Sequence, residues 1–237
     1  MKGCARHFGL MLAEITWLWR ASPEQVKALC DTEGVEHALE AAERGRGAMF
    51  ATGHCGNWEL LSARMPVGGI PLVSAVRELN HPGLDRLVTT TRTRFGTEII
   101  PRGPAAGRQL ARALSKKKIV GLLIDQDIRD VPGVFVPFFG RPAWTPSGLA
   151  TLSIRLGSPV LPGFIHRLPD GTHKAEVHPP LPVPEGGSLE DRIEELTAAA
   201  TAVVERQIRA HPEQWVWKHR RWRRRADAPK GHAESPA

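Results

Sequence analysis

The sequence predicts an α/β fold in which helices flank a mixed, largely parallel sheet. Short apolar runs of strand length, such as 47–52 and 118–127, alternate with stretches of helical periodicity. These runs are apolar throughout, as expected of strands that helices cover on both faces. Because no linker divides the 237 residues, we expect one domain over 1–225 and a polar, disordered tail over 226–237.

The first part of the chain, 1–45, is predicted to form helices. Apolar residues recur at helical spacing over 8–20, a stretch shorter than the ~20 apolar residues that span a membrane. It either packs on the core or lies in a membrane interface, which would suit Trp17 and Trp19. Two more helices are expected here, one opened by Ser22-Pro23 and one over 35–45.

The rest of the chain alternates strands and helices in an order typical of a sheet that helices cover on both sides. Strands are expected over 47–52, 70–77, 98–102 and 118–127, and helices over 57–65, 84–95 and 105–118. A helix over 146–157 follows, then a hairpin of 159–167 and 173–181, then a long helix opened by the capping box of Ser188 and Asp191.

Candidate site residues fall at the carboxyl ends of two predicted strands, where ligand sites of such sheets gather. His54 follows one strand, and Asp125 and Asp127 end another. Glu59 lies five residues after His54, which turns a helix by about 140°, so the two side chains share no helical face. They meet only if His54 sits in the turn and Glu59 in the first helical turn. A carboxylate on one ring nitrogen would then leave the other free as a base.

Asn57 and the N–H groups of that turn could stabilise an anion nearby. Simpler readings stay open for the other candidates. Asp125 and Asp127 could cap or pair structurally, and Arg77 and Arg92 could be exposed charges. Phe138 and Phe139 either pack in the core or contact an acyl chain.

The net charge of +7 predicts an anionic partner, which could be nucleic acid, a membrane or a phosphorylated substrate. Basic and aromatic residues interleave near the end of the chain, which suits an anionic membrane, single-stranded nucleic acid, or a merely solvated helix end. They include Arg220, Arg221, Trp222 and Arg223. Cys4, Cys30 and Cys55 lack metal-ligand spacing and indicate free thiols in a reducing compartment. We expect neither a metal nor a cofactor.

His54-Cys-Gly-Asn-Trp-Glu59 resembles the His-x4-acid motif of glycerolipid acyltransferases, in the form found in the late acyltransferases of bacterial lipid A biosynthesis. Further segments are similar to the same family, collinearly from about residue 5 to 225. They are AVRELNHPGLDRLVTTTRTRFG (75–96), GLLIDQD (121–127), GVFVPFFGRPAWTPSG (133–148) and PEQWVWKHRRWRRR (212–225).

The resemblance implies a glycerolipid acyltransferase-like fold and a reaction. An acyl group moves from acyl carrier protein to a hydroxyl of a lipid A precursor, an anionic glycolipid, without a covalent enzyme intermediate. His54 is implied as general base with Glu59 as its orienting partner, and Arg92 and Asp125 complete the catalytic set. Asn57, Trp58, Arg77 and Asp127 are implied in substrate binding or site architecture. Cys55 is then a packing residue.

The resemblance also implies a peripheral enzyme on the cytoplasmic face of the inner membrane, although the family's usual N-terminal anchor is absent from this chain. A membrane or a lipid phosphate is then the expected partner of the basic segment, which contains Arg220, Arg221, Trp222 and Arg223, and no nucleic acid is expected. An alternative acceptor is a mannosylated phosphoinositide or a lysophospholipid. That phosphoinositide branch normally carries Asp at the acid position, so Glu59 favours lipid A. Two other classes stay open, a nucleic-acid-binding module and a hydrolase that uses the same histidine.

Overall fold

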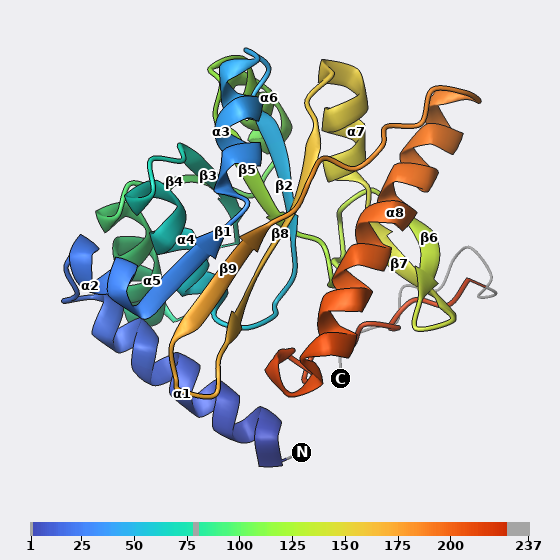
Figure 1. The fold of residues 1–237 in the computed structure, drawn as a ribbon. Coiled ribbons are helices and arrows are strands. Elements are labelled where there is room, and N and C mark those ends of the chain that lie inside the picture. Colours follow the sequence, from blue (N-terminus) through green and yellow to red (C-terminus); the bar gives the residue numbers. More distant parts are fainter. Residues whose placement is uncertain (1, 78–80, 227–237) are drawn as a thin grey trace.

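The computed structural model describes residues 2–77 and 81–226, and within these ranges seven strands form one sheet (Figure 1). The strand order is β1-β9-β8-β2-β5-β3-β4, and of these neighbours only β8 and β9 run antiparallel. The predicted mixed, largely parallel sheet is therefore confirmed. The strands are β1 Cys30–Glu33, β2 Ala48–Thr52, β3 Leu72–Val76, β4 Glu98–Pro101, β5 Ile119–Leu123, β8 Val160–Arg167 and β9 His173–Val177.

Helices cover both faces of this sheet, because successive side chains of the central strands point to opposite sides. In β2, Met49 and Ala51 join a core with α6, α7 and α8, whereas Ala48 and Phe50 join a second core with α1 to α4. The helices of the described residues are α1 Lys2–Leu18, α2 Pro23–Leu29, α3 Val35–Glu43, α4 Trp58–Val67, α5 Pro82–Arg94, α6 Ala106–Ser115, α7 Gly148–Leu156 and α8 Leu189–Ala210, with a short 3₁₀ turn η1 at Pro212–Gln214.

The predicted helix starts are confirmed where the sequence carries a capping signal. Ser22 accepts a hydrogen bond from the Gln25 backbone, and Ser188 accepts one from the Asp191 backbone, each completing a capping box. The hairpin of β8 and β9 is confirmed as well.

Two features were not predicted. Strand β1 has only four residues, three of them polar, and pairs at the edge of the sheet with β9. The second is a separate hairpin of β6 Gly133–Phe138 and β7 Arg141–Pro146. Its two-residue turn, Phe139-Gly140, has positive φ at both positions, for which Asn-Gly is the usual signal.

Contacts with α8 hold Phe139 in that unusual conformation. Its N–H donates to the Glu205 carboxylate at 2.5 Å, and the Arg209 guanidinium lies 4.6 Å from the centre of its ring. These contacts come from a helix far along the chain, so the sequence near the turn does not reveal them.

Helix α1 packs on the core, as one interpretation of the 8–20 stretch predicted, and the membrane interpretation stays a prediction. Met11, Ile15 and Leu18 are buried against the core, whereas Phe8, Leu12 and Trp19 are exposed. Among the described residues, no helix is both long enough and apolar enough to span a bilayer. The predicted tail, apart from Ala226, lies outside the described residues.

Candidate active site

His54 and Asp125 come together at the carboxyl edge of the sheet, because their strands β2 and β5 are parallel neighbours. The Nδ1 atom of His54 lies 2.7 Å from Oδ1 of Asp125, and the His54 backbone N–H donates to Oδ2 at 2.9 Å. The Trp215 indole N–H donates to the same Oδ2 at 2.8 Å. The carboxylate is thus fully engaged and holds the imidazole in one orientation.

The glycines around His54 allow this approach. A side chain at Gly53 would press on the Asp125 carboxylate, with a Cβ only 3.3 Å from Asp125 Cγ. Gly56 has φ of 59°, and a Cβ there would overlap the carbonyl of Ile165. The turn between β2 and α4 therefore requires glycine at 56, whereas a side chain at 53 would have to push Val204 and Asp125 slightly aside.

The electrostatics of the pair favour a charged carboxylate. Burial alone would raise the pKa of Asp125, but the His54 ring and the Trp215 indole outweigh it and lower that pKa to about 2. Asp125 is almost fully buried, whereas the His54 side chain keeps about a fifth of its surface exposed, 21%. The Nε2 atom of His54 lies 3.3 Å from the side-chain nitrogen of Gln126, a neutral group. With Nδ1 engaged by Asp125, Nε2 is the nitrogen left to accept a proton.

Glu59 does not contact the His54 ring, so the expectation that it orients the imidazole is wrong, and Asp125 takes that place. Glu59 is the second residue of α4, and it points toward α5. There the Arg92 guanidinium grips it with two hydrogen bonds of 2.6 and 2.5 Å.

Trp58 connects this ion pair to the histidine. Its indole N–H donates to Glu59 at 3.0 Å, and its ring packs edge-to-face against His54 with centroids 4.9 Å apart. Glu59 and Arg92 are thus connected to the His54 ring indirectly, through Trp58.

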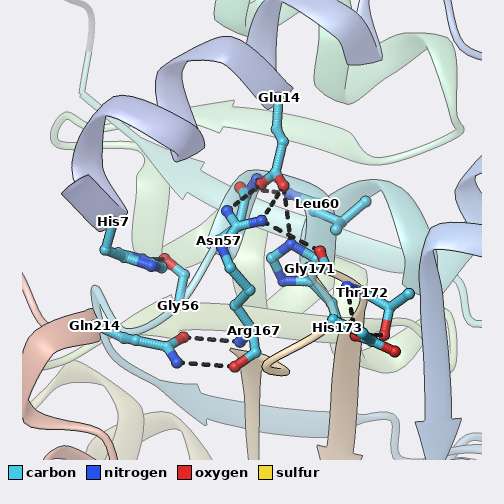
Figure 2. Close-up of polar contacts among 11 residues, drawn as sticks. His7, Glu14, Gly56, Asn57, Leu60, Arg167, Gly171, Thr172, His173 and Gln214 are labelled. Atoms are coloured by element: carbon cyan, nitrogen blue, oxygen red, sulfur yellow. Dashed lines mark hydrogen bonds and ion pairs between the residues drawn. The ribbon is translucent and has the colours of Figure 1, made fainter. Parts of the chain in front are cut away.

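Asn57 lies inside the protein rather than facing a substrate. It is the N-cap of α4, and its side-chain oxygen accepts a hydrogen bond from the Leu60 N–H. Its side-chain nitrogen donates to Glu14 on α1 at 2.7 Å (Figure 2). Both of these side-chain bonds are structural, and its full burial keeps it away from a substrate anion.

Glu14 is the centre of a buried polar network that the sequence did not predict (Figure 2). It forms an ion pair with Arg167 at the end of β8 and accepts a hydrogen bond from the His173 ring at 3.1 Å. Burial raises its pKa, but the hydrogen bonds of His173, Arg167 and Asn57 together lower it to about 2. His7, also on α1, lies 3.2 Å from the Gly56 carbonyl. Helix α1 is thereby fastened to the turn that carries His54.

Residues 211–226, which follow α8 and are called the closing segment below, pack over the turn that carries His54. Gly56 N–H donates to the Gln214 carbonyl at 2.8 Å, and Val216 N–H donates to the His54 carbonyl at 3.2 Å. The Gln214 side chain bonds both the N–H and the carbonyl of Arg167, at 2.7 and 3.0 Å. These bonds hold Trp215 where its indole N–H donates to Asp125. Only a few of these residues stood out in the sequence, because their partners lie tens of residues away.

Arg221 is buried, so the expectation that it binds a membrane or lipid phosphate is wrong. Only 1% of its surface is exposed. Its guanidinium donates to the Trp144 carbonyl and the Thr145 hydroxyl, both at 2.5 Å, and lies over the Phe138 ring. Burial lowers its pKa to about 10, which keeps it charged at neutral pH.

The neighbouring residues divide between the interior and the surface. Trp222 is half-buried and packs on Phe138, with ring centroids 5.7 Å apart. Phe138 itself is fully buried, which favours the core-packing interpretation, whereas Phe139 is half-buried. Arg220 and Arg223 are exposed.

Two further predicted residues lie at the carboxyl edge. Asp127 is buried and accepts a hydrogen bond from the Arg224 N–H at 2.9 Å, while its own N–H donates to the His219 ring at 3.2 Å. It therefore anchors the closing segment. Arg77 is exposed directly after β3, next to the strand that carries Asp125.

Comparison with known proteins defines the class to which this fold and site belong, an acyltransferase. Residues 1–224 match the family model described as bacterial lipid A biosynthesis acyltransferase. The chain belongs to that family.

Curated relatives align over most of the chain. The lipid A biosynthesis lauroyltransferase of Escherichia coli K12 is 29% identical, over 92% of this chain and 69% of that protein. The phosphatidylinositol mannoside acyltransferase of Mycolicibacterium smegmatis is 27% identical, over 81% of this chain and 62% of that protein. The lipid A biosynthesis palmitoleoyltransferase of E. coli K12 is 27% identical, over 93% and 70%. The chain thus spans about two thirds of the length of these relatives.

Proposed function

We propose that this acyltransferase moves a fatty acyl chain from acyl carrier protein to a hydroxyl of a lipid A precursor or a related glycolipid, with His54 as general base. One observation carries the proposal: Asp125 holds the His54 ring by Nδ1, which leaves Nε2 uncommitted to a carboxylate on a side chain that is 21% exposed. A family of acyltransferases and a positioned imidazole together favour attack by a hydroxyl on an acyl carbonyl.

In the proposed reaction, Nε2 of His54 accepts one proton and later returns it, so no other acid or base is needed. The acceptor hydroxyl gives its proton to Nε2 of His54 while its oxygen attacks the thioester carbonyl carbon. The C–S bond then breaks, and the departing sulfur takes the proton back from the imidazolium. Asp125 stabilises the imidazolium between these steps, because its charge lies 2.7 Å from Nδ1.

Gln126 occupies the place where the acceptor would bind. Its amide nitrogen lies 3.3 Å from Nε2, slightly farther than the roughly 2.6 to 3.2 Å that a bound hydroxyl oxygen would take. In the proposed mechanism the acceptor hydroxyl displaces this amide. The freed N–H₂ group can then donate to the hydroxyl or to the developing oxyanion.

Glu59 and Arg92 support this chemistry without touching the reacting atoms in the proposed mechanism. Each neutralises the other through two short hydrogen bonds, and both side chains are largely buried. Their proposed role is to keep Trp58 packed against the His54 ring.

We further propose that the enzyme works as a peripheral protein at an anionic membrane, on the cytoplasmic face of the inner membrane. Helix α1 lies at the end of the sheet where β8 turns into β9, which is the carboxyl edge (Figure 1). Phe8 and Leu12 are exposed on it, Trp19 is exposed directly after it, and Trp217 is exposed beyond η1. Exposed Arg220 and Arg223 add positive charge to the closing segment. Apolar and basic side chains together suit an anionic bilayer.

A mannosylated phosphoinositide is the second candidate acceptor, because the phosphatidylinositol mannoside acyltransferase of M. smegmatis is nearly as similar as the lipid A enzymes. A nucleic-acid module fits less well. Arg221 is buried and Arg224 pairs with Asp127, so part of the basic segment's charge is used inside the protein.

Purified protein tests the proposal directly. Acyl-carrier-protein thioester is supplied alone, with a lipid A precursor, or with a mannosylated phosphoinositide, and products are read by mass spectrometry. Ester formed only with a glycolipid supports the proposal, and the better acceptor identifies the branch. Fatty acid released equally without acceptor would instead define a hydrolase. Absence of any turnover of the thioester would contradict acyl transfer from this donor.

A further inference from the structure

Two arginines lie side by side at the carboxyl edge, one strand beyond the catalytic pair. Strands β3 and β4 are parallel, and Val76 is in register with Pro101. The next residues, Arg77 and Arg102, therefore leave the sheet together. The Arg102 N–H donates to the Val76 carbonyl at 2.8 Å, which holds the two backbones adjacent at this point.

The two guanidinium groups are not neutralised by the described part of the protein. Neither has an ion pair or a hydrogen bond to a residue in 2–77 or 81–226, and both residues are exposed. Desolvation and the positive charge of Arg77 both lower the pKa of Arg102, as expected of two like charges held close together. Arg92, the other arginine considered for the site, is instead fully occupied by Glu59.

We propose that Arg77 and Arg102 form a binding site for a phosphate group of one of the two substrates. The inference rests on the proposed function and adds a subsite to it. A phosphate ester offers several charged oxygens and can accept forked hydrogen bonds from two guanidinium groups at once. A single carboxylate would neutralise only one of them.

The position of the pair sets a length for the substrate that fits. Strands lie about 4.8 Å apart, so β3 is roughly 10 Å and β4 roughly 15 Å from β2, which carries His54. The backbones of Arg77 and Arg102 therefore leave the sheet roughly 10 and 15 Å from that of His54, and the bound phosphate is separated from the reacting group by a distance of this order. Both a phosphate on a glycolipid acceptor and the phosphodiester of the donor's pantetheine arm share this chemistry.

A four-way kinetic experiment separates the two sources. The double variant Arg77→Gln with Arg102→Gln is compared with the wild type and with Arg155→Gln, an exposed arginine at the end of α7 on the opposite edge. Acceptors with and without phosphate are combined with two donors. One is the acyl-carrier-protein thioester, and the other is an acyl-N-acetylcysteamine, which has no phosphate.

The double variant should raise KM about tenfold or more for the substrate that carries the bound phosphate, with kcat nearly unchanged. The defect should disappear when that one phosphate is missing, and the substrate for which it disappears identifies the source. Arg155→Gln should match the wild type throughout. Equal defects in all four combinations, or no defect in any, would overturn the phosphate site.

A binding measurement keeps the site separate from the reaction. Glucosamine 1-phosphate and pantetheine 4′-phosphate are titrated into the wild type and the double variant, with thermal melts as a check on folding. At least one of them should bind the variant about tenfold more weakly. If the wild type binds such a probe and the variant does not, but no acyl transfer occurs, the proposed function fails and the site stands. If transfer proceeds and both proteins bind the probes equally, the site fails.

Discussion

At the scale of single residues, His54 is the group on which the proposed chemistry depends. His54→Ala should lower kcat/KM by about 10²- to 10⁴-fold, because the acceptor hydroxyl loses its base. The fold should be retained, since the ring is partly exposed. Acyl-transfer rates and thermal melts of the purified variant check both expectations. Turnover at the wild-type rate would remove His54 from the mechanism.

Asp125 and Glu59 have different roles in the structure. Asp125 holds the His54 ring, whereas Glu59, which the sequence predicted as the partner of the histidine, pairs with Arg92. Asp125→Asn should lower kcat by about 10³-fold or more, because the amide cannot stabilise the imidazolium at Nδ1. Glu59→Gln leaves that contact intact and breaks the pair with Arg92, so its main effect should be on stability. Steady-state kinetics and urea unfolding of both variants test the distinction. A larger loss of kcat from Glu59→Gln would restore Glu59 as the partner of the base.

Sequence reasoning located His54 and Asp125 at strand ends but did not pair them. They are 71 residues apart, and their contact depends on β2 and β5 being neighbours, which the order of elements along the chain does not specify. Glu59 lies only five residues from His54 in the sequence, and it was therefore predicted as the partner that orients the imidazole. Arg221 was misplaced for a related reason, since a run of arginines does not reveal which one turns inward.

At the scale of elements, α1 is joined to the turn that carries His54 by Glu14, whose pKa is about 2. A lowered carboxyl pKa stabilises the fold above the unfolded value near 4, and this contribution is lost as the pH falls toward 2. Glu14→Gln should therefore cost about 3 kcal/mol of unfolding free energy at pH 7, and far less at pH 2.

Urea unfolding at several pH values checks this prediction, with Glu185→Gln as the control. Glu185 is exposed in the loop before α8, so its variant should follow the wild type at every pH. An equal cost of Glu14→Gln at pH 2 and pH 7 would show that its charge is not what secures α1.

The helices and the central strands were predictable because their signals are local. Capping boxes and apolar runs act over a few residues, as at Ser22 and Ser188. The β6–β7 hairpin was not predictable, since Phe139 adopts its left-handed conformation only where α8 supplies Glu205 and Arg209.

At the scale of the whole molecule, the N-terminal stretch that contains α1 exposes apolar side chains at the carboxyl edge of the sheet (Figure 1). The triple variant Phe8→Ser, Leu12→Ser and Trp19→Ser should bind anionic vesicles roughly tenfold more weakly or worse, because these side chains no longer insert. Leu39→Ser with Leu156→Ser, exposed apolar residues on α3 and α7, is the matched control. Sedimentation with vesicles measures the difference, and equal losses in both variants would argue against docking by α1.

The basic segment gives a contrasting pair of variants. Arg220→Gln with Arg223→Gln should weaken vesicle binding by about 1 kcal/mol per charge at low salt and less at high salt. Arg221→Ala should instead lower the melting temperature, because the carbonyl of Trp144 and the hydroxyl of Thr145 lose their buried partner. Loss of vesicle binding from a folded Arg221→Ala protein, with no change in melting temperature, would contradict its buried position.

The indole that donates a hydrogen bond to Asp125 belongs to Trp215, 90 positions further along the chain. During synthesis, His54 and Asp125 leave the ribosome well before Trp215 does. A nascent chain that ends before Trp215 would therefore carry His54 and Asp125 without the indole that helps to align them, and it should be inactive until Trp215 has been added.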